Sequence, residues 1–191
     1  MGLFSKKQCL VCGGNMGIVT DNKIAEGGIC HDCAAKLSPW YRGMRSATIN
    51  QILDQLNYRE ANREKVARFH TTLSYGRGNT RLLIDEDNCK FMVTSASDLI
   101  SANPDVLDLA DITGCEVEVE TNSYEIMDNR NPGGPGGPGG PGGPNMPEGP
   151  RPHRYLYDFY IKISVNHPFF NTIRFKLNDS SVEMEDIASN Y

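Results

Sequence analysis

Four of the six cysteines lie in one short stretch near the N-terminus, as two Cys-x-x-Cys pairs, Cys9 with Cys12 and Cys30 with Cys33. A Cys-x-x-Cys turn presents two thiolates from one tight loop, and two such turns face to face supply the four soft ligands of a tetrahedral zinc ion. This spacing predicts a structural zinc site, because four protein ligands leave no open coordination position. His31 lies inside the second pair as an alternative ligand, but with four thiols available we expect it to face solvent.

Two other interpretations use the same thiols. An iron site of the rubredoxin kind has the same ligands, and ligand softness alone does not separate iron from zinc. A redox dithiol needs only one Cys-x-x-Cys pair and leaves the other unexplained. So short a segment has almost no core of its own, and bound zinc contributes on the order of 10–16 kcal/mol to the folding of such modules. We therefore expect the segment to fold only with metal.

Short elements must bring the two pairs together. Gly13–Gly14 follow the first pair and permit a sharp bend. Ile18–Ile24 has an Asp-Asn turn signal at its centre, which predicts a short hairpin between the pairs. Ala34–Leu37 favour a short helix after the second pair, ended by Pro39. Knuckle, hairpin, knuckle and helix in this order are typical of a treble-clef or zinc-ribbon module, here residues 1–45.

A helical connector is predicted over residues 46–76. Thr48 with Gln51 three positions later is a capping-box pattern. An apolar stripe follows at helical spacing: Ile49, Ile52, Leu53 and Leu56. More polar turns come next, with Glu64 and Arg68 spaced for an i,i+4 ion pair. We expect these helices to pack on the domain that follows; binding a partner is the alternative.

From residue 77 to residue 191 the hydrophobic period is two, which predicts a mostly antiparallel β domain. Arg81–Ile84 and Cys89–Val93 flank an acidic turn and predict a hairpin. Thr113–Thr121 alternates apolar residues with three glutamates, which predicts one buried face and one solvated face. Cys89 and Cys115 are then expected to be small core residues.

The longest predicted strand is Tyr155–Val165, and Ile173–Leu177 supplies a further one. Its apolar row is expected to pack in the core, with stacking on bases or a ligand as the alternative: Tyr155, Tyr157, Phe159, Ile161, Ile163 and Val165. Between the strands, residues 129–152 contain four Gly-Gly-Pro triplets. Because proline lacks an amide donor and glycine has no side chain to bury, this insertion is expected to be disordered, extended and PPII-like, with contact to a partner as the alternative.

The segments "CLVCGG" and "GGICHDCAAKLS" resemble the four-cysteine zinc-ribbon domain that begins a family of uncharacterised bacterial proteins. Further on, "YREANREKVARFHTTLSYG", "LLIDEDNCKFMV" and "YDFYIKISVNHPFFNTIRFKLN" resemble the helical segment and PH-like β domain of the same family. The resemblance implies an α+β fold: a treble-clef or zinc-ribbon module, a helical connector, and a mostly antiparallel PH-like β-sandwich or barrel. It implies metal at Cys9, Cys12, Cys30 and Cys33 and no established activity. PH-like domains usually finish with a helix, for which "SSVEMEDIASNY" leaves little room, so that helix is expected to be absent or truncated.

Charge and composition narrow the function classes. The net charge is −5, of which residues 1–45 carry +3 and the remainder −8. This is not the strong basic footprint of a dedicated nucleic-acid-binding protein. No apolar run approaches the ~20 residues of a transmembrane helix, and "MGLFSKKQC" has no apolar region of a secretory signal. We expect a cytoplasmic protein, where clustered cysteines usually indicate metal or redox chemistry.

No catalytic motif was found: no G-x-S-x-G, no H-E-x-x-H and no P-loop. We therefore expect no enzymatic activity, since a metal-dependent enzyme needs an open coordination site. The sequence favours a non-enzymatic zinc-binding scaffold or adaptor that recognises a protein or membrane-associated partner, without naming that partner or the oligomeric state. The alternative is a nucleic-acid-binding zinc-ribbon protein that uses the basic residues of its first module: Lys6, Lys7, Lys23, Lys36, Arg42 and Arg45.

Overall fold

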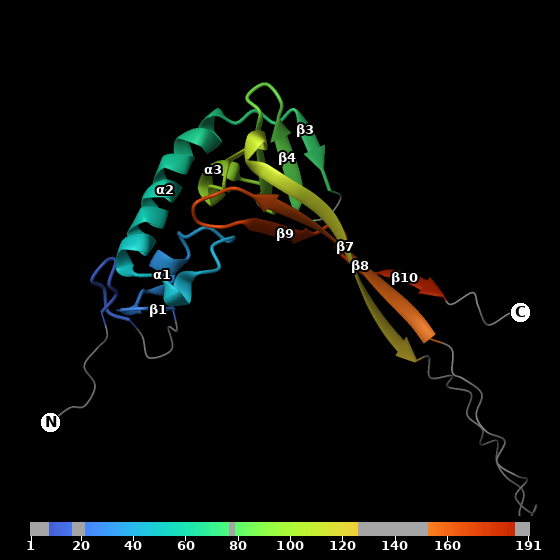
Figure 1. The fold of residues 1–191 in the computed structure, drawn as a ribbon, viewed down its shortest axis with the longest axis horizontal. Coiled ribbons are helices and arrows are strands. Elements are labelled where there is room, and N and C mark those ends of the chain that lie inside the picture. Colours follow the sequence, from blue (N-terminus) through green and yellow to red (C-terminus); the bar gives the residue numbers. More distant parts are fainter. Residues whose placement is uncertain (1–7, 17–21, 77–78, 126–152, 186–191) are drawn as a thin grey trace, which may run out of the picture.

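The structure is a computed structural model that describes residues 8–16, 22–76, 79–125 and 153–185. The chain forms an arch (Figure 1): the N-terminal module and a long helix make one leg, two β-sheets make the top, and a long hairpin makes the other leg. The helices are α1 (His31–Ala34), α2 (Ile49–Arg68) and α3 (Leu99–Ala102), with 3₁₀ turns η1 (Met44–Ser46) and η2 (Leu109–Asp111). The strands are β1 (Lys23–Ile24), β2 (Gly27–Gly28), β3 (Leu73–Tyr75), β4 (Arg81–Asp85), β5 (Lys90–Thr94), β6 (Leu107–Asp108), β7 (Ile112–Glu125), β8 (His153–Val165), β9 (Thr172–Lys176) and β10 (Val182–Glu185).

The N-terminal module is built around a small hairpin in which β1 pairs antiparallel with β2. The predicted turn at Asp21–Asn22 is not the turn of this hairpin, because Lys23–Ile24 pairs with the glycines that follow it; residues 17–21 lie outside the described part of the chain. The helix after the second cysteine pair also differs from the prediction. It spans His31–Ala34, so it begins at the knuckle itself and is over before Leu37.

One hydrophobic cluster joins this module to the start of α2. Its buried members are Cys9, Ile24, Ile29, Cys33, Leu37, Ala47 and Ile52. Two contacts fix the hairpin turn against the helix: the Ala25 N–H donates to the Ala47 carbonyl at 2.9 Å, and the Ile49 N–H donates to the Glu26 carboxylate at 2.9 Å. A carboxylate at a helix N-terminus also interacts favourably with the helix dipole. The division of the chain at residues 45 and 76 stays a prediction.

Helix α2 is one continuous helix of 20 residues. It begins with the predicted capping box, in which Thr48 Oγ1 accepts from the Gln51 N–H at 3.3 Å and the Gln51 side chain accepts from the Thr48 N–H at 2.9 Å. The predicted pair of Glu64 and Arg68 is present, with N···O at 3.6 Å. The predicted stripe is confirmed at Ile52, which is fully buried, and at Ile49 and Leu56, which pack against the same cluster, but Leu53 is 40 % exposed. From Ile52 onward the buried face continues through polar positions that the stripe did not predict: Gln55, Arg59 and Asn62, followed by Val66.

Two antiparallel sheets follow, as the period of two predicts. The first has the order β3-β4-β5-β6. In the second, β8 is central, with β7 along one side and β9 and β10 at different ends of the other side. The main core lies between the sheets and contains Phe91, Val93, Leu107, Ile163, Val165, Phe170, Ile173 and Phe175.

The β7–β8 hairpin extends well beyond this core (Figure 1). Its register runs from Gly114 opposite Ser164 to Glu125 opposite His153. The first sheet covers only its base, so Ile163 is buried and Ile161 packs against the core, whereas the outer part of the β8 apolar row, Tyr155 to Phe159, is only partly buried. The prediction that the whole row packs in the core is wrong for this outer part.

The predicted burial of the two remaining cysteines is also wrong. Cys89 is exposed in the turn before β5, where its φ of 52° places it in the left-handed region. Cys115 is exposed on β7, on the same face of the strand as Val117 and Val119.

At the end of the described chain, β10 pairs with the Arg154–Tyr157 part of β8. Residues 186–191 and the Gly/Pro-rich insertion at 129–152 lie outside the described residues. No helix in the described part of the chain is long and apolar enough to cross a membrane.

Candidate metal centre

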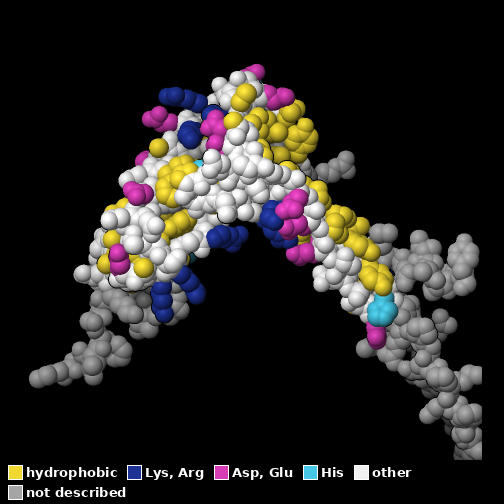
Figure 2. Space-filling model, in the orientation of Figure 1, with side chains coloured by type: hydrophobic (Ala, Val, Ile, Leu, Met, Phe, Trp, Pro, Cys, Tyr) yellow, Lys and Arg dark blue, Asp and Glu magenta, His cyan; other side chains and the backbone are white. Residues whose placement is uncertain are grey.

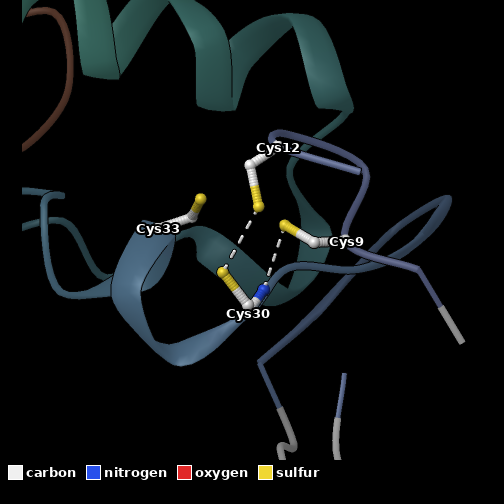
Figure 3. A group of neighbouring side chains, drawn as sticks. All are labelled: Cys9, Cys12, Cys30 and Cys33. Carbon is white, nitrogen blue, oxygen red and sulfur yellow. Dashed lines mark hydrogen bonds between the residues drawn. The ribbon is translucent and has the colours of Figure 1, made fainter. Parts of the chain in front are cut away.

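The side chains of the four N-terminal cysteines point toward one another beside α1 (Figure 3). Their Sγ atoms all lie within 4.8 Å of one another. Cys12 Sγ is 3.7 Å from Cys30 Sγ. A tetrahedron with sulfur about 2.3 Å from a central ion has edges of about 3.8 Å, so the observed spacing suits one ion held by four sulfurs. All six cysteines are free thiols, so no disulfide competes for these sulfurs.

The backbone around the first pair is shaped as the sequence predicts. The Cys9 N–H donates to the Gly14 carbonyl and the Gly13 N–H donates to the Cys9 carbonyl, both at 2.8 Å, which closes a tight knuckle. Gly13 has a φ of +71°, a conformation that costs glycine nothing and other residues about 1 kcal/mol or more. In the second pair, Cys30 is the N-cap of α1 and Cys33 lies within the helix.

Burial divides the four ligands into an inner and an outer pair. Cys9 and Cys33 are buried, Cys30 is half-buried and Cys12 is exposed. His31 is exposed on α1, as expected, and is not among the residues that could hold a metal ion in the described chain. The donor set is therefore four thiols, which is the set typical of structural zinc and also of iron in rubredoxin-like sites.

The electrostatics of the site favour a bound cation. Burial alone would raise the pKa of the Cys9 thiol, but backbone N–H groups from Cys12, Cys30 and Val11 outweigh it and lower that pKa to about 6. One of these is the Cys30 N–H, 3.2 Å from Cys9 Sγ. Burial and the neighbouring sulfurs raise the pKa of Cys33. Cys9 therefore deprotonates readily, whereas deprotonation of Cys33 beside the other sulfurs is unfavourable without a cation. A divalent metal ion would compensate the negative charge of the thiolates.

A buried polar network, which the sequence did not reveal, ties the module to the rest of the protein. The Arg59 guanidinium donates to the Asp105 carboxylate at 2.8 Å and, through Nε, to the Lys36 carbonyl at 3.2 Å. The Ser38 hydroxyl donates to the same carboxylate at 2.8 Å, and the Ser38 N–H donates to Gln55 Oε1 at 3.3 Å. Segments from the cysteine module, α2 and the loop before β6 therefore meet at one buried charge pair.

A second part of the network lies farther along α2. The Asn62 side chain donates to Asn103 Oδ1 at 2.9 Å and to the Pro104 carbonyl at 2.7 Å, and it accepts from the Val106 N–H at 2.9 Å. Asn103 donates in return to the Arg59 carbonyl at 2.8 Å. The sequence offered one local indication that these polar side chains are buried. Gln55 and Asn62 fall at helical spacing on the same face as Ile52 and Val66.

The fold and the site thus define a protein in which a four-cysteine cluster that could bind a metal precedes a mostly antiparallel β domain. Residues 7–55, less than half of the chain, match a family described as a domain of unknown function, DUF4428. The matched segment contains all four cysteines and the first turns of α2. No curated protein and no solved structure matches the chain. The relation of the β domain to PH-like folds and a bacterial origin stay predictions.

Proposed function

We propose that this protein is a non-enzymatic adaptor whose N-terminal module is held together by one structural zinc ion and whose β domain recognises a partner protein. The observation that carries the proposal is the convergence of the four sulfurs on one point, with a spacing that fits a single tetrahedral ion. Four thiolates fill the coordination shell, so the ion stabilises the fold and no ligand position is left for a substrate.

The surroundings of the sulfurs support a structural role. The two buried cysteines belong to the same hydrophobic cluster as Ile29 and Ile52, so the metal centre is part of the module's core. The knuckle, hairpin, second knuckle and short helix follow the order of a treble-clef module. The two successive antiparallel meanders are the reason to retain a PH-like assignment for residues 77–191 as part of the proposal.

Three of the four histidines of the described chain, His31, His70 and His167, support the proposal that the protein is not an enzyme. His31 is exposed, and His70 lies near Asp87 on the surface with N···O at 3.9 Å. His167 packs against Phe170 with ring centroids 4.1 Å apart, and burial lowers its pKa. These positions suit packing and surface roles better than proton transfer to a shared substrate.

Nucleic-acid binding by the first module is the second candidate. Of the predicted basic residues, Lys23, Lys36, Arg42 and Arg45 are exposed, and Lys6 and Lys7 lie outside the described residues. Lys and Arg side chains are visible on the inner side of the arch in Figure 2. If these residues contact phosphates, affinity for a short DNA or RNA duplex falls steeply as salt concentration rises. Absence of binding at low ionic strength removes this candidate.

The metal assignment is tested by measuring metal content in the purified protein and by replacing the ion with Co²⁺. We expect stoichiometric zinc and a cobalt spectrum with sulfur-to-metal charge transfer and tetrahedral d–d bands. The variant Cys9→Ser, Cys12→Ser should lose the metal and the packing of the module. The matched control is Cys89→Ser, Cys115→Ser, which removes the two exposed thiols outside the cluster and should keep both. Bound iron or a cobalt site with an exchangeable water would overturn the assignment.

The adaptor role needs its own test. The intact chain and the Cys89→Ser, Cys115→Ser control are expected to retain the same partner protein in cross-linking and affinity capture. A screen of turnover against hydrolysable esters, phosphoesters and peptides is expected to give none above background. Turnover that follows the metal content of the protein would contradict the adaptor proposal.

A further inference from the structure

Strand β7 is long and open along one edge. It pairs with β8 over its whole length, and no other strand of the described chain pairs with its opposite edge. In an antiparallel strand every second residue directs its N–H and C=O groups to each side, so from Cys115 to Tyr124 this edge presents backbone groups that pair with no other described residue. Most of β7 is exposed. Such an edge is a ready template for another strand.

The two faces beside this edge differ in chemistry. On one face Val117 and Val119 are 61 % and 51 % exposed, far more than valines in a covered sheet. On the other face stand Glu116, Glu118 and Glu120, and β7 contains no Lys or Arg. Figure 2 shows the same division along the arm, with apolar side chains on its outer side and charged ones on its inner side.

The glutamate row is only partly neutralised. Lys162 lies 2.5 Å from Glu116, and Arg174 lies 2.6 Å from both Glu118 and Glu120. Both cations come from β8 and β9, on the side away from the open edge. Two cations against three carboxylates leave net negative charge, and the side chains of Glu116 and Glu120 remain 58 % and 54 % exposed. A further cation can therefore reach the glutamates from the open edge of β7, as a side chain of a strand added there.

We propose that β7 binds an extended segment of a partner protein as an added β-strand, and that this segment alternates Lys or Arg with apolar side chains. The basic side chains would lie on the glutamate face and the apolar ones beside Val117 and Val119, since cross-strand neighbours share a face. A second copy of this chain fits poorly, because antiparallel pairing of β7 with itself puts two glutamate rows on one face. This inference rests on the proposed adaptor function and specifies how the partner is held.

The test uses the zinc-loaded full chain and a synthetic peptide that alternates lysine with valine over the length of Cys115–Thr121. Binding is measured by fluorescence polarisation, and backbone protection by hydrogen exchange. We expect saturable binding that slows amide exchange in β7 and leaves β10 unchanged. A peptide that alternates glutamate with valine, and a peptide of the same composition without alternation, should bind more weakly.

Backbone and side-chain variants separate an added strand from simple charge attraction. A peptide N-methylated at the alternate residues that face β7 should not bind, whereas methylation at the other residues should be tolerated. In the protein, Glu116→Gln and Glu120→Gln should each weaken binding by roughly two- to five-fold. Asp87→Asn, which neutralises an exposed carboxylate outside β7, should have no effect.

Three outcomes would overturn the inference. The first is equal binding of the two N-methylated peptides, and the second is a dimer of the chain alone that protects β7 in a concentration-dependent way. The third is protection of the N-terminal module in place of β7. Loss of the metal-stabilised fold or discovery of turnover counts against the adaptor function instead, so the two failures are distinguishable.

Discussion

Replacement of Asp105 by Asn tests the buried junction between the cysteine module, α2 and the β domain. Asp105 is 2 % exposed, and its carboxylate accepts from Arg59 and from the Ser38 hydroxyl. Asn has the same shape but no charge, so the substitution leaves the guanidinium of Arg59, a residue that is only 7 % exposed, without a counter-ion. The change therefore isolates the charge with little disturbance of packing.

The expected cost follows from the burial of both partners. Removing one member of a buried ion pair typically destabilises a protein by about 3–5 kcal/mol, because the remaining charge is neither solvated nor paired. The Arg59 bond to the Lys36 carbonyl remains and holds the cost within this range. Since small domains unfold with about 5–15 kcal/mol, the variant loses a large share of its stability.

The assay is urea unfolding of the zinc-loaded protein, followed by fluorescence and by circular dichroism. Trp40 is the only tryptophan, and its backbone N–H donates to the Ser38 hydroxyl at 3.1 Å, so the ring lies next to this junction and its emission reports on it. Metal content measured in the same samples distinguishes loss of the ion pair from loss of the metal. The control is Glu60→Gln, which breaks the exposed pair with Arg63 and should cost less than about 0.5 kcal/mol.

A double variant decides whether the charge pair is the cause. Arg59→Met with Asp105→Leu removes both charges, and a buried pair replaced by apolar residues is often close to neutral. We expect the double variant to be more stable than Asp105→Asn. Additive losses in the double variant, or a loss below about 1 kcal/mol in Asp105→Asn, would refute the reasoning.

Other expected outcomes concern single positions. Thr48→Ala removes the capping box of α2 and should cost about 1 kcal/mol in urea unfolding, whereas Thr48→Ser should not. Phe91→Ala empties a fully buried position in the main core and should cost about 3–5 kcal/mol. Hydrogen bonds from the His70 N–H and the Asn88 side chain lower the pKa of Asp85, so its charge stabilises the fold above the ordinary carboxyl pKa. That contribution is lost as pH falls through the lowered pKa, so the stability gap between the native chain and Asp85→Asn should be present at neutral pH and close in acid.

Local patterns predicted the elements whose causes are local. The Cys-x-x-Cys spacing led to four cysteines that the fold does bring together, and the Thr48–Gln51 pattern placed the start of α2 correctly. The alternation in Tyr155–Val165 predicted the strand β8, which the structure extends to His153. In each case neighbours in sequence carry the information, through turn geometry, capping or face periodicity.

The remaining features depend on contacts between distant residues. The polar residues of α2 are buried because Asp105 and Asn103, more than 40 positions away, complete their hydrogen bonds. The alternation of β7 separated apolar from acidic residues correctly, but the predicted burial of the apolar face is wrong at Val117 and Val119, because the first sheet does not reach that far along the strand. Cys89 was predicted to lie on a strand in the core, but its left-handed backbone belongs to the turn before β5. The strand pattern did not show where that turn ends.

The length of helix α2 sets the distance between the sulfur cluster and the sheets. The helix is about 30 Å long and clamped at both ends, by the Glu26 carboxylate at Ile49 and by the His70 N–H, which donates to Asp85 at 2.9 Å. A tilt of the N-terminal cysteine module would therefore rotate α2 as a rigid body and move the end of β4 with it. Inserting one turn into α2 would lengthen the helix by about 5.4 Å. Arg59 and Asn62 would then be displaced from the loop before β6, to which they are hydrogen-bonded.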